Sequence, residues 1–141
     1  MITLSMMILR NNLLFIQFFD RLVEGGLFFM LPILCMLFLI LFLIIKSVIH
    51  ILKDQTRLKK NITLINSIGL LTLVWGMLGQ LIGIIGMFDK VEMIGEISTH
   101  IFAGGLKVSA LPPVFGFFVF IISRIATIIF TWIQKEEEPI Q

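Results

Sequence analysis

Three long apolar stretches dominate the chain and predict three membrane-spanning helices. They cover residues 27–45, 62–88 and 108–132. About 20 apolar residues suffice to cross a hydrocarbon core that is about 30 Å thick. The pattern therefore predicts an all-α polytopic membrane protein with a three-helix membrane domain at residues 27–134. Polar connections at 46–61 and 89–107 separate the spans, and a polar tail at 135–141 follows the last one.

Two shorter segments mix apolar and polar residues and predict helices that lie along the membrane surface. Residues 11–24 interleave the two kinds of side chain, which is typical of an interfacial helix, and we assign the N-terminal region 1–26 to it. Within residues 89–107, apolar side chains at helical spacing predict a short amphipathic outer helix that ends at Gly104 and Gly105. These side chains are Val91, Ile94, Ile97 and Ile101.

One face of the second apolar stretch carries small residues almost without interruption. Steps of three and four residues separate them, so they line up along one side of a helix. The stripe, called the glycine seam below, consists of Gly69, Gly76, Gly79, Gly83 and Gly86, with Thr72 among them. Small residues let helix backbones approach closely in a bilayer, where water gives little drive for association. We expect the glycine seam to pack against neighbouring helices.

The composition agrees with a membrane protein. Hydrophobic residues make up 58% of the chain and charged residues 14%, against about 45–50% and about 25% in soluble domains. A formal charge of +2 is too small and too scattered to indicate a nucleic-acid partner. Cys35 is the single cysteine, so the chain forms no internal disulfide. No arrangement typical of an enzyme is present, and we expect neither catalysis nor a cofactor or metal.

The distribution of lysine and arginine predicts the orientation in the membrane. Residues 46–61 contain five basic residues and only one acidic residue, Asp54, whereas residues 89–107 contain two basic residues and three acidic ones. Basic connections stay in the cytoplasm. With three spans, the N-terminus is expected outside and the C-terminal tail inside.

Helix-breaking and polar residues give the third stretch its candidate chemistry. Pro112 and Pro113 either start a helix or kink it, because neither has a backbone N–H. Irregular backbone at membrane depth is tolerated where protein covers it or where it lines a wet cavity. We expect Arg124 to reach the cytoplasmic surface as an interface anchor. A bound anion or lipid headgroup is the functional alternative for its guanidinium.

Three passages, taken in order, resemble the MotA/TolQ/ExbB proton channel family, the membrane-embedded subunits of ion-driven motors. The family's entry into its first span resembles residues 24–46, EGGLFFMLPILCMLFLILFLIIK. Its second-span signature is similar to residues 66–88, NSIGLLTLVWGMLGQLIGIIGMF, and its third-span pattern to residues 103–123, AGGLKVSALPPVFGFFVFIIS. The long cytoplasmic insertion of many members is reduced here to residues 45–61.

The resemblance implies a pentamer of this subunit around single-span partners of the ExbD/TolR/MotB kind, each with one intramembrane aspartate. The second and third spans would line the pore and the first would face lipid. The glycine seam would pack against sister chains in this ring-shaped homo-oligomer. The family places threonines beside the aspartate, where this chain has Leu73, Pro112 and Pro113. The nearest polar substitutes are Thr72, Gln80 and Ser109. The candidate pore-lining residues are therefore Thr72, Leu73, Gln80, Ser109, Pro112 and Pro113.

The leading hypothesis is a proton-channel-type subunit in the bacterial cytoplasmic membrane that couples proton motive force to work by its partner. A non-conducting scaffold of the same architecture is the first alternative, and the missing threonines favour it. A small pore-forming or lysis protein is the second, because three spans and short connections would suffice for it.

Overall fold

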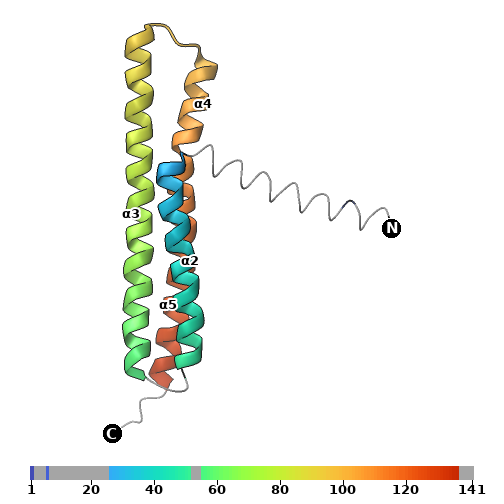
Figure 1. The fold of residues 1–141 in the computed structure, drawn as a ribbon, viewed down its shortest axis with the longest axis vertical. Coiled ribbons are helices and arrows are strands. Elements are labelled where there is room, and N and C mark those ends of the chain that lie inside the picture. Colours follow the sequence, from blue (N-terminus) through green and yellow to red (C-terminus); the bar gives the residue numbers. More distant parts are fainter. Residues whose placement is uncertain (2–5, 7–25, 52–54, 137–141) are drawn as a thin grey trace.

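The computed structural model describes residues 1, 6, 26–51 and 55–136, and these form an all-helical protein (Figure 1). The helices are α2 (Leu27–His50), α3 (Gln55–Ile94), α4 (Thr99–Ser109) and α5 (Leu111–Glu136). Three segments are long and apolar enough to cross a membrane, at Leu27–His50, Thr56–Ile94 and Thr99–Gln134. The prediction of an all-α protein with three spans is thus confirmed. The predicted N-terminal interfacial helix falls almost entirely outside the described residues.

Helix α3 is much longer than the apolar stretch that it contains. Its 40 residues rise about 60 Å at 1.5 Å per residue, about twice the thickness of the hydrocarbon core. Parts of both predicted connections are therefore helical, because neither 55–61 nor 89–94 contains a glycine or proline that would stop a helix. The first glycine or proline after residue 88 is Gly95. Its backbone has a positive φ of 81°, and α3 ends there.

The predicted amphipathic helix at 89–107 is divided between two helices. Val91 lies in α3, and α4 begins after Ser98, whose side chain accepts a hydrogen bond from the Ile101 N–H. The predicted end at Gly104 and Gly105 is wrong, since α4 continues to Ser109. The break occurs at Gly95 instead.

The two prolines start α5. Pro112 and Pro113 occupy its first turn, directly after the joint with α4 at Ala110. The Ala110 N–H donates to the Leu106 carbonyl at 3.2 Å, so α4 and α5 follow one another almost without interruption. First-turn positions tolerate proline because their N–H groups have no partner within their own helix.

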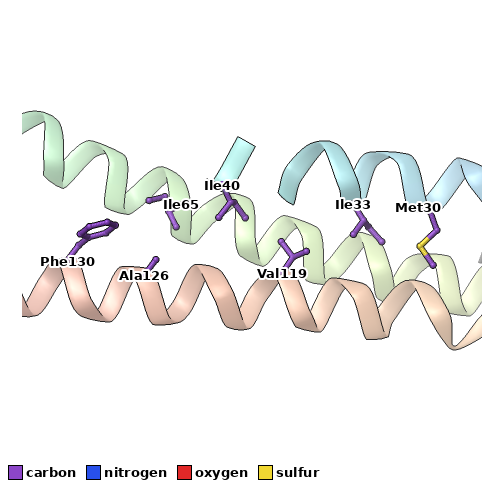
Figure 2. Packing of buried hydrophobic residues seen from close by; sticks show 7 residues of the cluster. All are labelled: Met30, Ile33, Ile40, Ile65, Val119, Ala126 and Phe130. Carbon is purple, nitrogen blue, oxygen red and sulfur yellow. The ribbon is translucent and has the colours of Figure 1, made fainter. Parts of the chain in front are cut away.

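The core lies where α2 meets the α3 and α5 pair. Figure 2 shows its buried apolar side chains, which are Met30, Ile33, Ile40, Ile65, Val119, Ala126 and Phe130. Helix α2 covers only part of the length of α3. The end of the molecule formed by α3 and α4, called the hairpin end below, extends beyond the start of α2 (Figure 1). The opposite end, where α5 leads to the C-terminus, is called the tail end.

Candidate functional site

The glycine seam packs closely against the end of α4 and the start of α5 in the same chain. A Cβ atom added to Gly76 would lie 2.7 Å from the Pro112 carbonyl oxygen. A Cβ atom added to Gly83 would lie 2.9 Å from the Cβ atom of Ser109. Real Cβ atoms essentially never come this close to other atoms. The absence of side chains at these glycines therefore sets how closely α3 approaches α4 and α5.

The other seam residues have different neighbours. A Cβ atom on Gly69 would overlap the Ser123 hydroxyl, and one on Gly79 would lie 3.0 Å from the Phe29 ring of α2. A Cβ atom on Gly86 would meet nothing within 4 Å. These contacts correct the expectation that sister chains cover the glycine seam. The neighbours of Gly69, Gly76, Gly79 and Gly83 are α2, α4 and α5 of the same chain.

A matching row of small residues on α4 and α5 explains why the seam is satisfied internally. The two antiparallel rows each repeat every seven residues, with Gly69, Gly76 and Gly83 on α3 facing Ser123 and Gly116 on α5 and Ser109 at the end of α4. At the centre, a Cβ atom on Gly116 would lie 3.0 Å from the Thr72 carbonyl oxygen. The role of Gly116 in this packing was missed by the sequence analysis. The seven-residue repeat on the third stretch is the signal that identifies it.

The hydroxyl groups in this interface bond to their own helices. Thr72 Oγ1 donates to the Ile68 carbonyl at 2.7 Å and also lies 3.1 Å from the Met36 sulfur. Ser109 and Ser123 each donate to a carbonyl three residues earlier, at 2.9 and 2.8 Å. Each of these buried hydroxyls therefore has its hydrogen bonded within its own helix.

The six candidate pore-lining residues fall into two groups. The structure buries Thr72, Ser109, Pro112 and Pro113 between helices of a single chain. Leu73 and Gln80, one heptad apart on α3, are half-buried. A pore between copies is lined by side chains that a single chain leaves accessible. Leu73 and Gln80 are accessible enough to line such a pore, whereas the side chains of the four buried residues are not.

Leu73 and Gln80 lie on the edge of the α3 and α5 pair that faces away from α2. Leu73 and Phe120 are both half-buried, yet neither belongs to the apolar cluster that α2 covers. Helical geometry places Leu73 and Gln80 about 80–100° around α3 from Thr72, which contacts α2. This surface is called the α3/α5 edge below, and its described members are Asn66, Leu73, Gln80, Phe120 and Arg124.

Polar groups on the α3/α5 edge are few. The Asn66 side-chain oxygen is buried without a hydrogen-bond partner among the described residues. The Arg124 guanidinium carbon lies 5.0 Å from the centre of the Phe120 ring, a cation–π contact. Because Phe120 precedes Arg124 by one turn, the arginine side chain lies along α5 toward the hairpin end in this structure. A role as an anchor at the tail end stays a prediction.

Among the described residues, no group of three or more histidine, cysteine, aspartate or glutamate side chains could hold a metal ion. The candidate site therefore consists of the packed glycine seam and the α3/α5 edge, which carries few polar groups.

Comparison with known proteins identifies one family. The model of the MotA/TolQ/ExbB proton channel family matches residues 45–139, about two thirds of the chain. The matched range begins near the end of α2 and covers α3, α4 and α5, so it includes two of the three passages on which the resemblance was based. No curated protein and no solved structure gives a significant match. The chain belongs to the MotA/TolQ/ExbB proton channel family.

Proposed function

We propose that this protein is the proton-conducting membrane subunit of an ion-driven motor in the bacterial cytoplasmic membrane. The observation that carries the proposal is the family match across α3, α4 and α5. In this proposal the chain is oriented with its N-terminus and hairpin end outside and its C-terminal tail inside, as the basic residues of the 46–61 connection favour.

The working assembly is a ring of copies, a pentamer by family resemblance, around a single-span partner with an intramembrane aspartate. The α3/α5 edge faces the central passage, and α2 faces lipid. The exposed side of α2 supports this orientation, since Phe38, Phe42 and Ile45 are large, apolar and uncovered there. Such side chains lose nothing by facing acyl chains.

The chemistry of the passage depends on how a carboxyl group is accommodated at membrane depth. A neutral carboxyl group in an apolar site needs hydrogen-bond partners, and an ionised one needs them far more. On the α3/α5 edge, the amide of Gln80 can both donate and accept. Arg124 adds a positive charge that stabilises an ionised carboxylate within its reach. Leu73 keeps the remaining surface between them apolar.

Proton flux into liposomes tests the proposal, with this protein and its partner reconstituted together. We expect flux that is lost when the partner's aspartate is replaced by asparagine. Gln80→Leu should lower the flux several-fold, because it removes an amide that faces the passage. Thr72→Val, which removes a hydroxyl already bonded inside the chain, should leave the flux unchanged and serves as the matched control.

Other outcomes would point to the alternatives. Absence of flux that neither Leu73→Thr nor Pro113→Thr restores would leave a non-conducting scaffold, which the internally bonded hydroxyls favour. Flux in liposomes without any partner would indicate a pore-forming protein instead. Equal flux in the Gln80→Leu and wild-type proteins would place the proton path away from the α3/α5 edge.

A further inference from the structure

We propose that the N-terminal segment, residues 13–24, docks in an apolar groove at the hairpin end of its own chain and completes the bundle there. The proposal rests on the position of Gly26. The described stretch 26–51 begins at this residue, and Gly26 also lines the groove. The proposal is independent of proton conduction.

The groove lies between α3 and α4 and has a volume of about 580 Å³. Its walls are mainly apolar, with Met87 and Val91 from α3 and Ile101 from α4. Glycines widen it on both sides, since a Cβ atom on Gly86 or Gly104 would meet nothing within 4 Å. The groove can therefore take side chains from a further element without movement of its walls.

The groove exists because α2 is too short to cover the hairpin end. At its start, α2 lies level with the middle of α3, where the Phe29 ring approaches Gly79. Beyond that level α3 and α4 pack only on one another in the described structure (Figure 1). Large apolar side chains stay uncovered as a result, among them Ile94 at 68% and Ile101 at 65% exposure. Uncovered apolar surface of this kind marks an interaction site.

The position of Gly26 at the groove favours the N-terminal segment as the occupant. Gly26 precedes the first residue of α2 with a positive φ of 85°, which glycine adopts without strain. The chain therefore turns at Gly26 and does not extend α2 in a straight line. A segment that starts at the groove wall reaches the groove without a linker, which gives it a high effective concentration there.

The sequence of the segment matches the groove in pattern and length. Apolar and polar residues form two stripes at helical spacing, with Phe15, Phe18, Phe19 and Leu22 on one and Gln17, Asp20, Arg21 and Glu24 on the other. Residues 13–24 and the α3 stretch 83–94 contain the same number of residues, so as helices they have equal lengths. One apolar stripe would thus cover the whole uncovered part of α3.

The charges of the two surfaces are complementary. Lys90 is the one charged residue among the described residues that line the groove, and Lys107 lies in the last turn of α4. Asp20, Arg21 and Glu24 lie in the half of the segment nearest Gly26, so acidic side chains outnumber basic ones there by two to one. Opposite charges beside an apolar contact favour one orientation of the segment over its reverse.

Disulfide cross-linking of the full-length protein in membranes tests the proposal, in a Cys35→Ser background. We expect Leu22→Cys to cross-link with Ile101→Cys, within one chain, about tenfold faster than with Ile85→Cys, because docking raises the local concentration of the first pair. Ile85 is a fair control since it is 59% exposed and does not line the groove. Gly104→Leu, which fills the groove, should slow the Leu22 and Ile101 cross-link several-fold.

Two results would overturn the proposal. Equal rates for the Ile101 and Ile85 pairs would mean that the segment does not occupy the groove and that lipid covers it. A cross-link that joins two chains would mean that a second copy supplies the occupant. The first result is read from the rates at which the thiol pairs disappear, and the second from a product with twice the mass of the chain. A variant that fails to insert is recognised by its absence from the membrane fraction.

Discussion

Replacing Gly76 with leucine is expected to separate α3 from α5 and to prevent stable packing of the three-helix bundle. Gly76 lies at the closest approach of the two backbones, where even a single added carbon would lie 2.7 Å from the Pro112 carbonyl oxygen and 3.1 Å from Pro113 Cα. These are backbone atoms at the start of a helix, so no rotamer change can make room. Overpacking of this kind costs about 3 kcal/mol.

Thermal unfolding in mild detergent, followed by helix content and by size-exclusion elution, measures the effect. The matched control is Leu71→Phe on the same helix, which enlarges a side chain that is 52% exposed. Leu71 does not line the groove at the hairpin end, and its replacement should leave the melting of the α3 and α5 pair unchanged. Equal melting temperatures for the two variants would show that α3 and α5 are not packed through the glycine seam.

Phe130→Ala is expected to have the second-largest effect, by leaving a cavity at the tail end of the bundle. The Phe130 side chain is only 4% exposed and belongs to the core cluster with Ile65 and Ala126 (Figure 2). In soluble proteins such truncations cost about 3–5 kcal/mol. Because packing supplies much of the stability of helices in a bilayer, we expect about 3 kcal/mol here.

Steric-trapping or urea-denaturation measurements on the protein dispersed as monomers would quantify this loss. Trp132→Ala provides the control, since it removes a larger aromatic ring two residues away that is 69% exposed. We expect its effect on monomer stability to be under about 1 kcal/mol. A comparable loss for Trp132→Ala would contradict the packing described for α5.

The apolar pattern was sufficient to predict the number of spans but not the lengths of the helices. Long uncharged stretches indicate where hydrocarbon can surround a helix. Helix α3 continues beyond its uncharged stretch at both ends, because polar residues such as Lys59 and Glu92 are good helix formers. Its true end depends on the left-handed backbone of Gly95. A glycine is recognisable in a sequence, whereas only the structure shows that Gly95 has a positive φ and that α4 continues through Gly104.

The candidate site was predictable in part for a similar reason. Spacing along one helix identifies a face with small residues, but the partner of that face lies elsewhere in the chain or in another chain. Comparison of Gly76 with Gly116 resolves the ambiguity, since both belong to rows that repeat every seven residues. The burial of Thr72 and Ser109 could not be read from residue type, because a hydroxyl group suits both a wet passage and a bond to its own helix.

The joint between α4 and α5 has a mechanical consequence. Because Pro112 and Pro113 have no N–H, the two hydrogen bonds that would normally cross this point to the carbonyls of Val108 and Ser109 do not exist. Tilting α4 relative to α5 therefore breaks fewer backbone bonds than bending either helix at any other position. Ala110 is thus the point between α4 and α5 at which backbone hydrogen bonds restrain a change of angle least.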